Sequence, residues 1–236
     1  MPTQTIDVSG DPSAIDYAAA GLTWKIAKGV SVSGTESGVK SAYADSALVN
    51  LGTIVGNLAA VEFDPSTAPG DFLIKNQKSG VISAPFAVYV DDFDGTVSLR
   101  NKGKIAGANA ALQTDGNGQV NVNNDGRITA ELNGLNIAFA SATGGADIEN
   151  AGTLSAGNVA ILSDSAKGVR FQVHNLKGGL IEGGADAAAI SVDERLVLKN
   201  DGKIKGDIYA GDLGNKLASS GKIDGNAYLG AGDDKL

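Results

Sequence analysis

The sequence has little of the side-chain chemistry on which many active sites depend. Its 236 residues include no cysteine, one histidine and one methionine. The absence of cysteine excludes a disulfide framework and a thiolate metal site, although it does not separate cytosolic from exported proteins. A single histidine leaves few groups for nucleophilic catalysis, and redox catalysis by cysteine is excluded.

Aromatic residues and long apolar runs are also scarce. Aromatics make up 5% of a chain that is 42% hydrophobic, so its apolar content is mostly Ala, Val, Ile and Leu. Together with 33 glycines, this favours thin, regular β layers over a globular core. No apolar run approaches the length of a membrane span. The start, MPTQTIDVSGDPSA, lacks the basic and apolar regions of a signal peptide.

Net charge limits the partners that the sequence suggests. The formal charge is −8 at pH 7, which argues against general nucleic-acid binding, because such proteins attract phosphates with an excess of lysine and arginine. We therefore expect no nucleic acid among the partners.

One phrase recurs along the chain, and it has the form apolar-x-Asn-x-Gly-x-apolar. It reads LRNKGKI from Leu99 and LKNDGKI from Leu198. Successive asparagines are separated by 26, 25, 23, 26, 25 and 25 residues, and Ser219 follows 19 residues after the last. A fixed period of this length is the signature of a repeat architecture. The seven asparagines are Asn50, Asn76, Asn101, Asn124, Asn150, Asn175 and Asn200.

Around each asparagine, apolar and polar residues alternate over short segments, and Gly, Asn and Asp separate these segments. Alternation near period 2 predicts strands and turns, whereas no long segment has the 3.6-residue period of a helix. A unit of about 25 residues cannot bury its own apolar face, so successive units must stack. The sequence therefore predicts an all-β fold, a right-handed parallel β-helix of about eight or nine coils with a short N-terminal cap.

The recurring asparagine has a structural interpretation. It is expected at the turn between two strands, where its carboxamide bonds to the asparagine of the next coil. The alternative, a row of asparagines that binds a ligand, is less favoured. Residues on either side should form continuous inward stacks, with Leu99, Val122 and Ile148 in one and Ile105, Ile128 and Leu154 in another.

The pattern divides the chain into three segments. Residues 22–206 are predicted to form coils of about 25 residues, and residues 1–21 to form a cap over the exposed strand edge. Residues 207–236 have a period of 19 and are predicted to form shorter terminal coils. The sequence leaves open whether the chain is part of a longer protein.

The last coil contains a motif associated with calcium. Gly230, Gly232 and Asp234 fit the G-x-G-x-D-x-apolar core of a calcium-binding nonapeptide repeat, in which carboxylate and carbonyl oxygens hold the ion. Such a site needs ligands from two consecutive turns, and only one intact turn is present. Calcium is the one cofactor that the sequence suggests, and a solvent-exposed Gly-Asp turn is the alternative.

The phrases N-x-G-x-I-x-G and L-G-x-G-D-D-x-L resemble the stacked repeats of bacterial secreted surface proteins. These are the β-helical passenger regions of autotransporter and hemagglutinin-type adhesins, and RTX-type calcium-binding proteins. The resemblance covers about residues 22–236, and the chain departs from the RTX type in having one intact nonapeptide core. The resemblance implies export, a secreted or cell-surface location, and a polysaccharide or cell-surface ligand.

Parallel β-helices also include polysaccharide lyases, hydrolases and epimerases, which use clustered carboxylates. The densest acidic group is Asp91, Asp92 and Asp94, in a turn, and it is the candidate catalytic site. The matching turns contain Asp64, Asp115, Asp164, Asp193 and Glu194. A solvated acidic turn is the simpler interpretation, because no histidine or arginine pair completes a catalytic set.

Basic residues flank the asparagine turn at positions expected to point outward. Protection of strand edges explains such residues, and binding of acidic glycans or of an acidic partner surface is the alternative. The candidate binding residues are Lys75, Arg100, Lys104, Arg127, Lys199 and Lys203.

The sequence therefore favours a non-catalytic, secreted or cell-surface β-helical scaffold, an adhesin-like or matrix-associated binding module. A polysaccharide-active enzyme and an RTX-type calcium-binding module are the alternatives.

Overall fold

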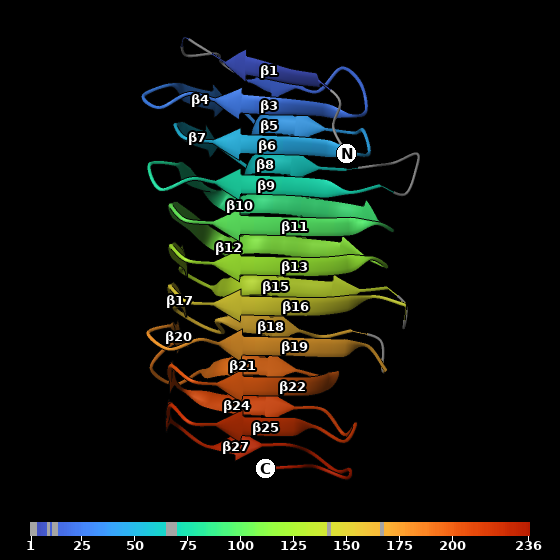
Figure 1. The fold of residues 1–236 in the computed structure, drawn as a ribbon, viewed down its shortest axis with the longest axis vertical. Helices are drawn as coiled ribbons and strands as arrows, with labels where there is room; N and C mark the ends of the chain where they lie inside the picture. The colour runs from blue at the N-terminus through green and yellow to red at the C-terminus, as the bar shows by residue number, and fades with distance from the viewer. Residues whose placement is uncertain (1–3, 9, 11–13, 65–69, 141–142, 166–167) are drawn as a thin grey trace.

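The chain winds into a rod of stacked parallel coils (Figure 1). The computed structural model describes residues 4–8, 10, 14–64, 70–140, 143–165 and 168–236. Within these residues every regular element is a β-strand, and adjacent coils pair in parallel over about eight turns. The prediction of a parallel β-helix is confirmed.

One sheet, which we call the front sheet, runs the length of the rod with all of its strands pointing the same way (Figure 1). Seven of its strands end at the recurring asparagine. Its ten strands, in spatial order, are β1 (Gln4–Val8), β3 (Leu22–Ile26), β6 (Ser46–Asn50), β9 (Phe72–Asn76), β11 (Thr96–Asn101), β13 (Gln119–Asn124), β16 (Gly145–Asn150), β19 (Arg170–Asn175), β22 (Arg195–Asn200) and β25 (Lys216–Ser219).

The remaining strands close each coil. The row that follows the asparagine turn contains β4 (Ser31–Gly34), β7 (Thr53–Gly56), β10 (Val81–Phe93), β12 (Lys104–Gly116), β14 (Arg127–Ala130), β17 (Thr153–Ala156), β20 (Leu180–Glu182), β23 (Lys203–Lys205) and β26 (Lys222–Asp224). The third row contains β2 (Ile15–Asp16), β5 (Ser37–Ser41), β8 (Ala59–Phe63), β15 (Asn133–Phe139), β18 (Ile161–Ser163), β21 (Ala188–Val192), β24 (Asp207–Ala210) and β27 (Ala227–Tyr228), and the long strands β10 and β12 run through both rows.

The core is a set of apolar columns parallel to the rod axis. Leu99 pairs with Val122 and Val122 with Ile148, and Ile105 and Ile128 are in register on the neighbouring row. All of them are at most 2% exposed. Because the coils keep their register, each inward residue packs on its equivalents above and below, and the predicted stacks are confirmed.

The predicted cap, residues 1–21, lies partly outside the described residues. Its described part continues the coil: β1 pairs with β3 and β2 pairs with β5, both in parallel. The buried Tyr17 hydroxyl donates a hydrogen bond to the Ala47 carbonyl, and desolvation raises the pKa of Tyr17. Whether the segment protects the strand edge stays a prediction.

The coil becomes shorter toward the C-terminus. Asn200 is in register with Ser219 and Lys203 with Lys222, so the repeat there is 19 residues. The corner between β23 and β24 consists of Gly206 alone, whose φ of 110° favours glycine. This shortening leaves a step in the outline of the rod.

Candidate binding surface at the asparagine corner

The seven asparagines form a continuous hydrogen-bonded ladder along one corner of the rod. The Nδ2 group of each donates to the Oδ1 atom of the next at 2.8–2.9 Å, and Asn200 donates to the Ser219 hydroxyl at 3.0 Å. Each Nδ2 group also bonds a backbone carbonyl of the following coil, as Asn101 does with Arg127 at 3.2 Å. All seven side chains are at most 1% exposed. The structural interpretation of the ladder is confirmed.

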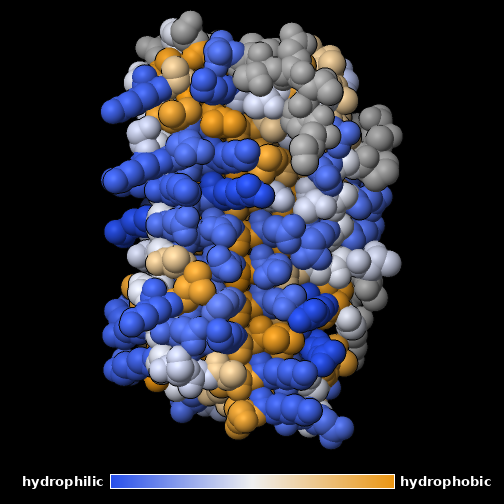
Figure 2. Space-filling model, in the orientation of Figure 1, coloured by the Kyte–Doolittle hydropathy of each residue, from blue (hydrophilic) through white to orange (hydrophobic). Residues whose placement is uncertain are grey.

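Basic side chains gather beside the ladder on three consecutive coils. We call this surface the basic corner and define it by six residues: Lys75, Lys78, Arg100, Lys102, Lys104 and Arg127. Five of the six are exposed and Lys75 is half-buried. Figure 2 shows hydrophilic side chains projecting in successive rows along this edge of the rod and across the front sheet.

The register of the strands brings these cations together. Lys75 of β9 is the direct partner of Arg100 in β11, and Lys104 of β12 is the partner of Arg127 in β14. Lys102 lies in the turn between β11 and β12. Adjacent parallel strands are about 4.8 Å apart, so the charged groups are close enough to repel one another.

In the described part of the chain, none of the six basic-corner side chains makes an ion pair or a side-chain hydrogen bond. Ion pairs within 4 Å do form on other coils, where the cations are Lys25, Lys40, Lys199, Lys205 and Lys222. A group of like charges without ion-pair partners carries a repulsion that an anionic ligand would relieve.

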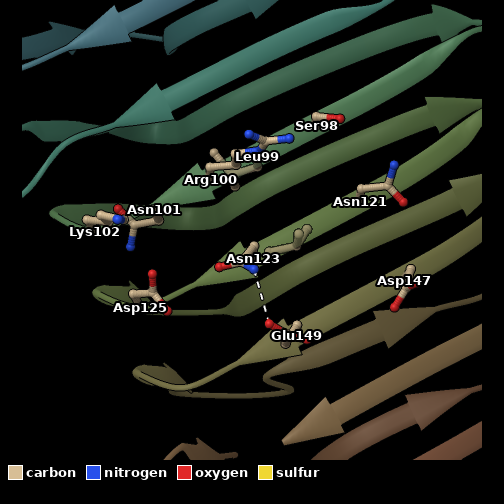
Figure 3. Close-up of a pocket in the computed structure, with 11 residues that line it drawn as sticks. Ser98, Leu99, Arg100, Asn101, Lys102, Asn121, Asn123, Asp125, Asp147 and Glu149 are labelled. Carbon is tan, nitrogen blue, oxygen red and sulfur yellow. Dashed lines mark hydrogen bonds between the residues drawn. The ribbon is translucent and has the colours of Figure 1, made fainter. Parts of the chain in front are cut away.

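A hollow of about 550 Å³ adjoins the basic corner on the front sheet. Arg100 and Lys102 line it on the side nearer the N-terminus, and Asp147 and Glu149 on the other side (Figure 3). Glu149 accepts a hydrogen bond from the Asn123 amide at 3.2 Å. The carboxylates limit the positive surface to the coils of β9, β11 and β13.

Comparison with known proteins assigns no family. No family model, curated protein or solved structure matches the chain. The described residues contain no helix that is long and apolar enough to cross a membrane.

The structure separates the basic residues that the sequence singled out. Lys75, Arg100, Lys104 and Arg127 lie together, whereas Lys203 is separated from Arg127 by Thr153 and Leu180 in the same column. The predicted edge is therefore not continuous. Lys78, which the sequence did not single out, lies in the turn that follows β9, the strand of Lys75.

Lys199 belongs to a different, fully paired cluster. Asp201 accepts from His174 Nε2 at 3.0 Å, from the Lys199 ammonium at 3.1 Å and from the Ser220 hydroxyl at 2.7 Å. These partners, His174 foremost, lower the pKa of Asp201. Since its charge is already compensated, Lys199 is a weaker candidate for binding an anion.

The acidic turn lies on another corner of the coil, at the end of β10. Asp91 Oδ2 accepts from the Tyr89 hydroxyl at 3.1 Å, and Asp94 Oδ1 accepts from the Asn117 amide at 3.0 Å. Asp92 is exposed and has a φ of 47°. Each carboxylate thus has a local structural contact or faces solvent. Their catalytic role stays a prediction.

One of the acids in the matching turns is buried. Glu194 is 0% exposed, its Oε1 atom accepts from the Ser163 hydroxyl at 2.8 Å, and its Oε2 atom has no partner in the described structure. Desolvation raises its pKa. Its burial follows the alternation along this segment, in which Val192 is buried, Asp193 is exposed and Glu194 is buried.

Asp234 of the calcium motif has a structural partner. Its Oδ1 atom accepts from the backbone N–H of Asn215 at 2.7 Å and from the Asn215 amide at 3.2 Å. Gly230 and Gly232 adopt φ values of 71° and 147°. Among the described residues, no group of three or more acids and histidines is arranged to hold a metal ion. Calcium binding stays a prediction.

Proposed function

We propose that this chain is a non-catalytic β-solenoid binding module, exported or displayed at a cell surface, that binds an acidic glycan at the basic corner. The observation that carries the proposal is the group of six cations on three consecutive coils, none of which has an ion-pair partner in the described structure. Resemblance of the repeat phrase to secreted adhesin repeats supports the location.

A glycan fits this surface better than a nucleic acid does. The basic corner spans only three coils; Asp125 lies in the turn of the third coil, and Asp147 and Glu149 follow on the next coil. A net charge of −8 repels a long polyanion elsewhere on the rod. The site therefore suits a short anionic segment, such as a few uronate or sulfated sugar units.

The experiment compares variants of equal charge. The corner variant replaces four cations with glutamine at positions Lys75, Arg100, Lys104 and Arg127. A control variant replaces four cations on other coils with glutamine at positions Lys28, Lys177, Lys216 and Lys235, so that both variants lose the same charge. Circular dichroism checks that both keep the fold.

Binding is measured against polygalacturonate, heparin and a single-stranded oligonucleotide, and the glycans are assayed for new chain ends. We expect the corner variant to lose about tenfold or more in glycan affinity, and the control to change by less than about threefold. Equal losses in both variants, or preferred binding of the oligonucleotide, would contradict the proposed ligand. Chain cleavage would contradict the non-catalytic assignment.

A further inference from the structure

A second hollow lies where the coil becomes shorter. Five residues, 183–187, connect β20 to β21, whereas Gly206 alone connects β23 to β24 one coil later. The two corners are held together by a hydrogen bond from the Gly183 amide to the Lys205 carbonyl at 3.0 Å. Because the longer corner has no equivalent in the next coil, a hollow of about 560 Å³ opens between them.

An exposed tyrosine forms one wall of this step hollow. Tyr209 lines it, and Tyr228 of the following coil stacks on Tyr209 with ring centroids 4.9 Å apart and planes 11° apart. The two residues are 44% and 49% exposed. Tyr228 does not line the hollow, so Tyr209 presents to it an edge or the face that Tyr228 leaves uncovered.

The polar lining offers both donors and acceptors. The Lys205 ammonium donates to Glu182 at 2.7 Å and retains further N–H groups. Asp207 accepts from the backbone N–H of Asn226 at 2.7 Å through Oδ1, and Oδ2 is 3.5 Å from the Tyr209 hydroxyl. Asp186 is exposed and has no hydrogen bond in the described structure.

We propose that the step hollow binds a neutral saccharide unit. The C–H groups on one face of a pyranose ring pack against an aromatic ring, and its hydroxyls both donate and accept. In this arrangement Tyr209 holds the sugar, Asp186 and Asp207 accept from its hydroxyls, and Lys205 donates to one of them.

The charge of the lining indicates that the ligand of the step hollow differs from the acidic glycan proposed for the basic corner. Four carboxylates and one ammonium line the step hollow, which disfavours a uronate or a sulfated sugar. The carboxylates would attract a cationic ligand, but an ammonium has no acceptor and could not use the N–H groups of Lys205. A neutral polyol satisfies both kinds of lining group.

The test titrates the full chain with neutral tetrasaccharides of β-1,4-glucan, α-1,4-glucan, β-1,4-mannan and β-1,4-galactan, by calorimetry and ligand-observed NMR. We expect at least one to bind, and Tyr209→Ala to weaken it by about tenfold. Tyr43→Ala is the matched control, because Tyr43 is a comparably exposed tyrosine at 41%. Asp186→Ala, at an exposed side chain without bonds, should also weaken binding while leaving the fold intact.

Two results would overturn the proposal. One is the absence of binding by every tetrasaccharide at about 10 mM, or binding that neither variant weakens. The other is Tyr209-dependent binding of spermidine without binding of any saccharide, which would identify a cation site. The corner variant should bind the neutral sugar as the parent does, so failure of one proposal is distinguishable from failure of the other.

Discussion

Asn124 occupies the middle of the ladder and satisfies four polar groups at once. It accepts from Asn101 at 2.8 Å and from the Gly126 amide N–H, and it donates to Asn150 at 2.8 Å and to the Thr153 carbonyl at 3.0 Å. The groups are buried or part-buried, so water does not readily replace the lost partner. An unsatisfied buried polar group costs about 1–3 kcal/mol.

We therefore expect Asn124→Ala to lower the free energy of unfolding by roughly 2–4 kcal/mol. The control is Asn123→Ala, one residue away, where the exposed side chain makes one hydrogen bond at 3.2 Å to Glu149. That change should cost less than about 1 kcal/mol. Urea denaturation of both variants measures the difference, and equal midpoints would refute the energetic role of the ladder.

Glu194 is the residue at which stability should depend on pH. Burial raises its pKa in the folded state, so the fold favours the protonated side chain. The fold therefore loses stability as the pH rises from about 4.3, the pKa of the unfolded state, through the higher pKa of the folded state. Glu194→Gln keeps an acceptor for Ser163 and removes the charge.

At pH 7 we expect Glu194→Gln to melt several degrees higher than the parent, with the gain shrinking as the pH falls toward about 4. Thermal melts across this pH range provide the measurement. Glu182→Gln, which removes a partly exposed ion pair with Lys205, should change the melting temperature little at any pH. A gain from Glu194→Gln that is constant with pH would contradict the assignment.

At the scale of the strand, stability depends on how many neighbours an inward residue has. Ile128 of β14 packs between Ile105 and Leu154 and is 0% exposed. Ile223 of β26 has one in-register neighbour, Ile204, and is only partly buried. Truncation of a buried isoleucine leaves a cavity, which costs about 2–5 kcal/mol.

We expect Ile128→Ala to lower the free energy of unfolding by an amount in that range. Ile223→Ala should lower it clearly less, because Ile223 has an in-register neighbour on one side only. Chemical denaturation of the two variants checks this difference. A loss at Ile223 as large as that at Ile128 would show that the last coil is as tightly packed as the middle ones.

The elements also show what the sequence could and could not predict. The strand rows and the ladder were predictable because the recurrence of Asn and the alternation of apolar residues fix the register that buries them. Which cations form ion pairs was not predictable. Lys199 and Lys75 occupy equivalent positions in their coils, and they differ only in whether an acid such as Asp201 lies within reach. The step hollow was also unforeseen, since the shorter period gives the coil length but not the distance between corners.

At the scale of the whole molecule, charge is unevenly distributed. The net charge is −8, yet six cations lie together at one corner. At physiological ionic strength the Debye length is about 8 Å, so the distant acids are largely screened while the corner acts on a ligand in contact with it. An anionic ligand should therefore contact the basic corner alone, and its affinity should fall as the salt concentration rises.

Lysine footprinting by mass spectrometry tests this claim most directly. The chain is acetylated with and without polygalacturonate or heparin, and the modification of each lysine is compared. We expect protection of Lys75, Lys78, Lys102 and Lys104, with Lys28, Lys177, Lys216 and Lys235 unprotected. Protection spread evenly over both sets, or confined to the second, would contradict this claim.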